Sequence, residues 1–527
     1  MSKHLKNIGI ISFLTLVSRF LGLARESLQL AIFGAGELLS AFNTANIFPN
    51  LFRRLLAEGS MTAAFVPVLQ EELHHNGQAG AFALLSKVTS WLITVSGALA
   101  LFAMVLFSQS RLFHGLPDRW YVGADLTVVL FPYLVLVSLA AAFCAALQVM
   151  GRFTEPAFNP VWLNLAIIAS LGIVSLHLAH TSMAQIHWLC AGWLLGGILQ
   201  MAVPAAVLIH EGWRPRLDLG LTPRVREIAS LMTPGIIGLS IYQINFAVSR
   251  LLAFSLDDVS ATYLYSVNRL VEVPQGVFAV AVSTVVYQLV AKHAVEGNRA
   301  ALAEDFRKGI RFILIVNIPA AAGLALLSRP IIEFFFKHGK VTAMAAHDMG
   351  ILLALMVISI PFFSVVGLAV RTFYAIKDTK TPVKIAAIDF LINIVVTVTL
   401  VFGFGLGVVG IAIAGTTAIM VQTFLLGGAL SRRFPDLKLA QLTPSLLKVL
   451  CGTALMTVAV GLGWRGVAHL PIAAQLRDAI AIFGLIPAGA AFYGAVIWLL
   501  RIEGGEDLSA LAGRFFGKKA PAGASQV

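Results

Sequence analysis

Six arginines lie within long apolar stretches of this chain, and three glutamates accompany them. The arginines are Arg19, Arg25, Arg53, Arg54, Arg250 and Arg269. The glutamates are Glu26 beside Arg25, Glu58 four residues after Arg54, and Glu272 three residues after Arg269. Spacings of three or four allow contact along a helix, yet the five arginines other than Arg250 outnumber the three glutamates and leave a formal charge of +2. Because a guanidinium group matches pairs of phosphate oxygens, the pattern predicts a binding site for a dianion such as a diphosphate.

An arginine in the middle of a membrane span has an unfavourable free energy of insertion, which restricts where its side chain can point. On insertion scales each one costs about 2.5–3.5 kcal/mol, so six facing lipid would cost on the order of 15–20 kcal/mol. That exceeds the net stability of a typical fold, which is about 5–15 kcal/mol. We therefore expect these side chains to face protein or a hydrated cavity. Arg250, near the end of its span, is the one best suited to reach the membrane surface instead.

Membrane-spanning helices must position these arginines. The 527-residue chain is 58% hydrophobic and 12% charged, whereas soluble domains carry about 25% charged residues. A span needs about 20 mostly apolar residues, and fourteen such segments follow one another along the sequence. The predicted fold class is an all-α polytopic membrane protein with 14 transmembrane helices. Segments 38–70 and 259–292 are too long to cross straight, so bends are expected at Pro49 and Pro274.

The distribution of basic residues predicts the orientation of the chain. With a cytoplasmic N-terminus, the cytoplasmic segments hold 25 of the 38 lysines and arginines and the outer loops hold 7. This asymmetry agrees with the positive-inside rule, so both termini are expected in the cytoplasm. It also accounts for the net charge of +12 without any nucleic-acid partner.

Two pairs of similar segments within the chain indicate a duplicated architecture. RRLLAEG at 53–59 resembles NRLVEVPQG at 268–276, and MGRFTEPAF at 150–158 resembles IKDTKTPVK at 376–384. Repeated halves are common in secondary transporters. We predict an N-terminal lobe of six helices in 1–215, a pseudo-symmetric C-terminal lobe of six helices in 216–440, two further helices in 441–505 and a cytoplasmic tail in 506–527.

The remaining residue types form no catalytic or metal-binding constellation. Cys144, Cys190 and Cys451 are isolated within apolar segments, as buried core cysteines are. Asp257 and Asp258 are adjacent, but their short loop, FSLDDVS, holds no companion base or set of metal ligands. We therefore expect a protein that binds and transports its substrate, and not an enzyme.

Several segments resemble those of one family of membrane proteins. They are SRFLGLARE at 18–26, FGAG at 33–36, PNLFRRLLAEGSMTAAFVPVL at 49–69, NRLVEVPQGVFAVA at 268–281 and KDTKTPVKIA at 377–386. The chain is similar in these segments to the MurJ (MviN) lipid II flippase family of the multidrug/oligosaccharidyl-lipid/polysaccharide exporter superfamily. The resemblance implies two six-helix lobes around a cationic cavity, and a groove for a polyprenyl tail formed by the two helices in 441–505.

The resemblance also implies roles for single residues. Matching positions make Arg19, Arg25, Arg53 and Arg269 the substrate-binding arginines, and Glu272 the carboxylate among them. Glu26, Arg54 and Glu58 complete the predicted substrate site. Two positions depart from the family pattern, which usually has aspartate where this chain has Glu26 and Ser40. Glu37, one helical turn before Ser40, is a candidate replacement for the second aspartate.

Some members of this family hold a sodium ion in the second lobe. Here Asp389 and Asn393 are four residues apart on one predicted helix, and Thr416 lies on the next. Their oxygen atoms suit a hard cation, although a polar patch that joins two helices explains the same residues equally well. Sodium is the only cofactor that the sequence suggests.

The resemblance implies a lipid II flippase, which moves an undecaprenyl diphosphate-linked muropeptide from the inner to the outer leaflet of the bacterial cytoplasmic membrane. Alternating access is the expected mechanism and cell-wall synthesis the expected purpose. The expected partners are lipid II, membrane lipids and the peptidoglycan synthesis machinery. Two alternatives remain: an exporter of another undecaprenyl-linked oligosaccharide, and a non-transporting cell-wall scaffold whose arginines would be dispensable.

Overall fold

The computed structural model describes residues 3–55, 60–275, 290, 292–294 and 296–501. Within these ranges every regular element is a helix, which confirms the predicted all-α class. The chain divides into two compact units, Met1–Ser266 with Phe335–Ala345, and Val267–Phe334 with Ala346–Val527. This division does not test the lobe boundaries at 215 and 440, which stay predictions, and the predicted tail at 506–527 lies outside the described residues.

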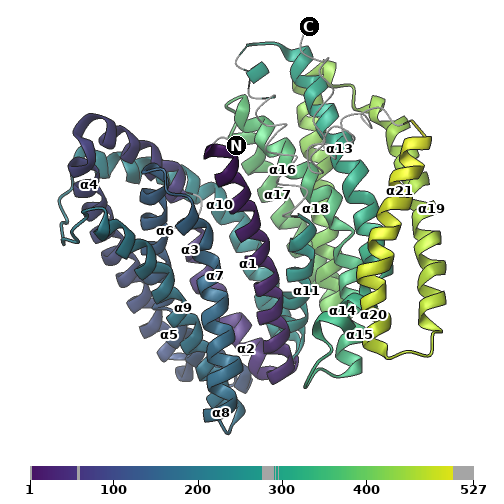
Figure 1. Cartoon of the computed structure of the whole chain (residues 1–527), viewed down its shortest axis with the longest axis horizontal. Helices are drawn as coiled ribbons and strands as arrows, with labels where there is room; N and C mark the ends of the chain where they lie inside the picture. Colours follow the sequence, from purple (N-terminus) through teal and green to yellow (C-terminus); the bar gives the residue numbers. More distant parts are fainter. Residues whose placement is uncertain (1–2, 56–59, 276–289, 291, 295, 502–527) are drawn as a thin grey trace. The chain divides into compact units, whose positions relative to one another are not determined.

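The first unit is a bundle of long helices (Figure 1). Its helices are α1 (Lys3–Phe33), α2 (Glu37–Ala45), α3 (Ile47–Arg53), α4 (Ser60–Ser108), α5 (Asp118–Leu130), α6 (Tyr133–Val149), α7 (Thr154–Ala169), α8 (Leu176–Leu178), α9 (Ser182–His210), α10 (Pro223–Leu256) and the start of α11 (Ser260–Pro274). The helix α4 is kinked at Gly77, where the backbone is not helical. Helix α7 packs against both α1 and α9, which brings three segments that are distant in the sequence into contact.

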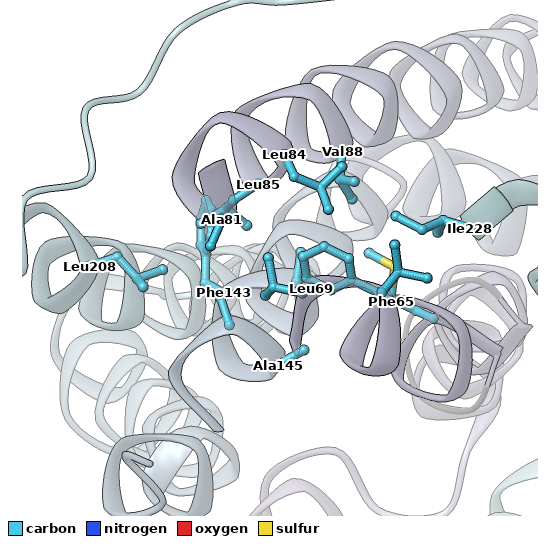
Figure 2. Close-up of a cluster of buried hydrophobic side chains, with 14 of the residues drawn as sticks. Phe65, Leu69, Ala81, Leu84, Leu85, Val88, Phe143, Ala145, Leu208 and Ile228 are labelled. Carbon is cyan, nitrogen blue, oxygen red and sulfur yellow. The ribbon is translucent and has the colours of Figure 1, made fainter. Parts of the chain in front are cut away.

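An apolar cluster of the first unit lies where α4, α6 and α10 meet. Figure 2 shows Phe65 and Leu85 of α4 with Phe143 of α6 and Ile228 of α10, all of them buried. Trp213, which follows α9, closes the cluster: its ring centroid lies 5.1 Å from that of Phe143. Because lipid tails are as apolar as these side chains, it is close packing between helices that stabilises such a cluster within the bilayer.

The second unit continues from α11 through a further set of helices. They are α13 (Arg299–Leu326), α14 (Ser328–Phe336), α15 (Ala343–Met356), α16 (Ser359–Ala375), α17 (Lys380–Val398), α18 (Gly407–Arg433), α19 (Thr443–Ala468), α20 (Ala474–Ile480) and α21 (Ile486–Leu499). Helices α19 and α21 lie side by side and pack along α13 (Figure 1). The hydroxyl of Tyr493 on α21 donates a hydrogen bond to the carbonyl oxygen of Ile315 on α13 at 2.9 Å.

Eight helices among the described residues are long and apolar enough to cross a membrane, or up to ten if two bent pairs each count as one span. This finding confirms a polytopic membrane protein. This number applies to the described residues, and the total of fourteen spans stays a prediction.

The duplication predicted from the sequence is visible in the helices. The pair α5 and α6 in the first unit is bent by 41°, and the pair α15 and α16 in the second is also bent by 41°. The helices that follow them, α7 and α17, begin at Thr154 and Lys380, which are 226 positions apart, and each ends in a π-helical turn. The same sequence of bend, helix and terminal π turn therefore occurs in both halves.

The bends predicted at Pro49 and Pro274 have different outcomes. The first overlong segment is broken, but the break is at Asn46, between α2 and α3, and Pro49 is the third residue of α3. A proline in the first turn removes an N–H that has no partner within the helix, so it is tolerated there. Pro274 is the last residue of α11; residues 276–289 lie outside the described ranges, so a bend there stays a prediction.

Candidate substrate-binding site

Two of the three charged residues on α1 that the sequence singles out, Arg25 and Glu26, are buried inside the first unit. Arg25 is 4% exposed and Glu26 is fully buried. Nη1 of Arg25 donates a hydrogen bond to Oδ1 of Asn164 on α7 at 3.1 Å. Glu26 accepts a hydrogen bond of 2.7 Å from the hydroxyl of Ser266 on α11. Arg19, also on α1, is half-buried.

The paired arginines lie at the end of α3. Arg53, the last residue of α3, donates from Nε to Oδ1 of Asn50 at 3.0 Å. The amide of Asn50 in turn donates to the side chain of Asn46 at 2.9 Å and to its carbonyl oxygen at 3.0 Å. Arg54 lies with its guanidinium carbon 5.8 Å from the ring centroid of Phe246 on α10. Glu58, which was predicted to pair with Arg54, lies outside the described residues.

One aromatic side chain lies against two cations of the first unit. Phe246 lies under Arg54 and also under Arg250, whose guanidinium carbon is 4.0 Å from its centroid. Arg250 lies over Tyr265 as well, at 4.7 Å. Two aromatic faces thus lie against the Arg250 guanidinium, and its reach to the membrane surface stays a prediction.

Arg269 and Glu272, in the second unit, form the ion pair that their spacing predicts. Nη1 of Arg269 lies 3.1 Å from Oε2 of Glu272 on the next turn of α11. Both side chains are 34% exposed, so the pair remains accessible to a ligand. The neighbouring Asn268 donates a long hydrogen bond of 3.5 Å to the same carboxylate.

Ser40, where the family pattern usually has aspartate, is fully buried. Its hydroxyl lies 2.6 Å from the carbonyl oxygen of Asp258 and 2.8 Å from the hydroxyl of Thr262. An ion pair of 2.8 Å between Arg119 on α5 and the Asp258 carboxylate secures the same loop. Glu37, at the start of α2, is exposed. A neutral hydrogen-bonding residue thus occupies the buried position, and the replacement by Glu37 stays a prediction.

The residues of the predicted sodium site lie on adjacent helices. Asp389 and Asn393 are one turn apart on α17, and Thr416 is on α18, which packs against α17. Oxygen donors of this kind fit a hard cation. Oδ1 of Asn393, however, accepts a hydrogen bond of 3.4 Å from Thr397, and the described residues contain no group of three acidic, histidine or cysteine side chains that could hold a metal. The sodium site stays a prediction.

The structure adds two residues to the site that the sequence does not reveal. Asn164 on α7 bonds Arg25, and the ring of Trp193 on α9 lies 4.9 Å below the Arg25 guanidinium carbon. Asn164 is a single amide in an apolar helix, and Trp193 is one of eight tryptophans in the chain. The one local signal is the GWLLGG sequence at 192–197, whose small residues allow a close helix approach.

Comparison with known proteins identifies relatives along almost the whole chain. The family model described as lipid II flippase MurJ matches residues 30–469. A probable lipid II flippase MurJ of Rhizobium meliloti is 30% identical, over 96% of this chain and 95% of that protein. The corresponding protein of Haemophilus influenzae is 31% identical, over 93% of this chain and 98% of that protein.

Solved structures agree on the fold. A lipid II flippase MurJ in an inward closed conformation matches 96% of this chain and 99% of its own, with a TM-score of 0.75 and 24% identity. An inward-facing multidrug transporter of the MATE family, in the MOP superfamily, matches with a TM-score of 0.64 and 12% identity over 82% of this chain. At these identities the structures establish the fold alone. The match of the family model over most of the chain, together with relatives at 30–31% identity across nearly the full length, shows that the chain belongs to the lipid II flippase MurJ family.

Proposed function

We propose that this protein flips lipid II across the bacterial cytoplasmic membrane. The observation that carries the proposal is a set of arginines on apolar helices of the first unit, three of which contact neutral amide or aromatic groups. Arg25 bonds Asn164, Arg53 bonds Asn50, and Arg54 lies against Phe246. Membership of the MurJ family indicates lipid II as the substrate, because its curated relatives are named probable lipid II flippases.

The arginines act by binding the diphosphate that links the sugar to its lipid. Each charge-assisted hydrogen bond to a phosphate oxygen contributes about 1.5–3 kcal/mol, so a few of them hold a dianion firmly. Arg25 and Arg53 supply this charge in the first unit. In the second unit Arg269 is the candidate cation, and Glu272 moderates its charge. No bond of the substrate is broken, so these residues bind and release and do not catalyse.

The protein alternates between states that expose the arginines to one side of the membrane and then to the other. The termini lie in the cytoplasm, in accord with the 25 to 7 distribution of basic residues. The polyprenyl tail stays in lipid beside the helices of 441–505. The membrane potential acts on any charge that crosses with the headgroup, by about 2.3 kcal/mol per elementary charge per 100 mV.

Complementation of a bacterial strain depleted of its own lipid II flippase tests the proposal. The wild-type chain is expected to restore growth, whereas Arg25→Ala and Arg269→Ala, expressed to the same level in the membrane, are expected to fail. Arg111→Ala is the matched control, because Arg111 forms an exposed ion pair with Asp125 and its side chain is 78% exposed. Loss of an exposed pair costs less than about 1 kcal/mol, so this variant should restore growth.

The outcomes separate transport from the alternatives. Failure of the wild-type chain to restore growth or to move lipid II in reconstituted vesicles contradicts the proposed substrate and favours another undecaprenyl-linked oligosaccharide. Full growth with both Arg25→Ala and Arg269→Ala contradicts the role of the arginines and favours a scaffold.

A further inference from the structure

Arg25 is the most deeply buried of the site arginines whose exposure is described, at 4%. Two of its contacts are to neutral groups: the amide oxygen of Asn164 at 3.1 Å and the ring of Trp193 at 4.9 Å. Such contacts fix a guanidinium group in place without cancelling its charge. We propose that Asn164 and Trp193 are positioning residues, which hold Arg25 ready for the diphosphate of the substrate. The inference rests on the proposed function and extends the site to helices α7 and α9.

The orientation of the Asn164 amide is determined by its partners. Nδ2 donates to the carbonyl oxygen of Ser18 on α1 at 3.1 Å and to that of Pro160 on α7 at 3.2 Å. Carbonyl oxygens can only accept hydrogen bonds and a guanidinium group can only donate them. The amide nitrogen must therefore face Ser18 and Pro160, which leaves Oδ1 facing Arg25. Asn164, itself 4% exposed, thus fixes one end of the guanidinium and ties α7 to α1.

Trp193 is held as firmly as Asn164. Its ring makes edge contacts with Phe42 and Tyr133, at centroid distances of 5.6 and 6.2 Å. Tyr133 is fixed in turn, because its hydroxyl donates to Oε1 of Gln200 at 3.1 Å. A locked ring is a rigid surface against which Arg25 can be placed.

Trp193 contacts Arg25 through the face of its ring, and its indole N–H makes no hydrogen bond among the described residues. Buried tryptophans usually find an acceptor for this group, yet Nε1 of Trp193 has no hydrogen-bond partner among the described residues. Trp213 is equally buried, at 3% exposed, and its Nε1 donates to the hydroxyl of Ser86 at 3.0 Å. The face of Trp193 is occupied by a cation, and tryptophan offers the strongest face for this interaction.

Close packing of α9 on α7 brings the two positioning residues to the same guanidinium. A Cβ atom added at Gly196 would lie 2.9 Å from Cα of Leu163, the residue before Asn164. At Gly192, the residue before Trp193, a Cβ atom would lie 2.7 Å from Cβ of Ser170. The two small residues let the helices approach until Trp193 and Asn164 flank Arg25.

Positioning matters because a free arginine side chain has many rotamers, and ordering it when the substrate binds would weaken affinity. Donors that are already aimed at the place where an anion will lie need no such ordering. Asn164 and Trp193 therefore act on substrate affinity only through Arg25. A residue that merely joins helices would change substrate affinity whether or not Arg25 is present.

A double-mutant cycle on the full-length protein in lipid nanodiscs tests this difference. The probe is undecaprenyl diphosphate, and the equilibrium dissociation constant is measured for wild type, Trp193→Leu, Asn164→Ala, Arg25→Ala and the two double variants. Trp193→Leu is expected to weaken binding by about tenfold, the scale of a desolvated cation–π contact. Trp193→Phe should fall between it and wild type, because it keeps a weaker aromatic face. In the Arg25→Ala background, Trp193→Leu and Asn164→Ala should each change the constant by less than about twofold.

Trp213→Leu is the matched control, since Trp213 lies in the same unit, is equally buried and packs against Phe143 away from Arg25. It is expected to bind the probe as wild type does. Equal losses in Trp193→Leu and Trp213→Leu, or an undiminished effect of Trp193→Leu without Arg25, would overturn the positioning role while the flippase function stands. A wild-type protein that does not bind the diphosphate lipid overturns both.

Discussion

Replacing Gly196 by alanine tests whether close packing of α9 on α7 shapes the site. An added Cβ atom would lie 2.7 Å from Cδ1 of Leu163, which can rotate away, but also 2.9 Å from its Cα, which cannot. The helices must therefore move apart. Overpacking of this kind costs about 1–3 kcal/mol, while alanine gains about 1 kcal/mol over glycine in a helix interior. The net expectation is a loss of stability of up to about 2 kcal/mol.

Gly415 is the matched control for Gly196. It lies inside α18, and a Cβ atom added there would meet no atom within 4 Å. Gly415→Ala should therefore gain stability by up to about 1 kcal/mol. Thermal unfolding of both purified variants in one detergent measures the difference, and complementation measures transport, which Gly196→Ala should impair because it separates Trp193 from Asn164. If Gly196→Ala unfolds at the same temperature as Gly415→Ala or above it, the close-approach reasoning is wrong.

Three further predictions concern residues outside the site. Gly339→Ala should unfold well below wild type, because Gly339 has a φ of 57° and an added Cβ atom would lie 2.8 Å from the carbonyl carbon of Ala31; an unchanged melting temperature would contradict this. Exchanging the charges of the Arg152–Glu211 ion pair should recover only part of the melting temperature that either single reversal lowers, because Arg152 also pairs with Glu155 at 2.8 Å; a double variant no better than the worse single one would refute the pairing. Burial acts to raise the pKa of Asp378, but hydrogen bonds from Thr381 and Lys380 and the charge of Arg433 outweigh it and hold that pKa below its ordinary value. The ionised carboxylate therefore stabilises the fold at neutral pH, and this contribution is lost as the pH falls from about 4 through the lowered pKa. The melting temperatures of wild type and Asp378→Asn should converge toward pH 3, and a gap that is constant with pH would count against this assignment.

Features that depend on neighbours along the chain could be predicted from the sequence. The apolar composition determines the helical membrane fold, and the three-residue spacing of Arg269 and Glu272 predicts an ion pair that the structure contains. The break in the first overlong segment was also predictable, but its place was not. Proline restricts the turn before it and is accommodated in the first turn of a helix, so the chain breaks at Asn46 and not at Pro49.

Features that depend on distant contacts could not be predicted. Arg25 lies 139 positions from Asn164, and periodicity along α1 carries no information on which residue of α7 faces it. Arg250 shows the same limit, because its position near the end of a span indicates only that it could reach the membrane surface. The aromatic rings that hold it come from α10 and from Tyr265 on α11, and only the packing of those helices reveals them.

Each half of the protein has an ion pair between the ends of two helices at corresponding positions, and the two pairs carry opposite charges at matching residues. In the first unit Arg152, just before α7, pairs with Glu211, just after α9. In the second unit Asp378, just before α17, pairs with Arg433 at the end of α18. Arg152 and Asp378 are 226 positions apart, the separation of Pro156 and Pro382.

Coulomb attraction depends on the product of two charges, so an ion pair of this kind is equally attractive when both charges are reversed. A site for an anion has no such freedom, because each of its cations must stay positive. On the proposed function, this difference accounts for the uneven distribution of the arginines over the two halves: four come from α1 and the end of α3, and one comes from α11. A protein that binds a single diphosphate, as proposed, has no need of a second copy of the site, so the ion pairs between helices are kept while the binding residues diverge.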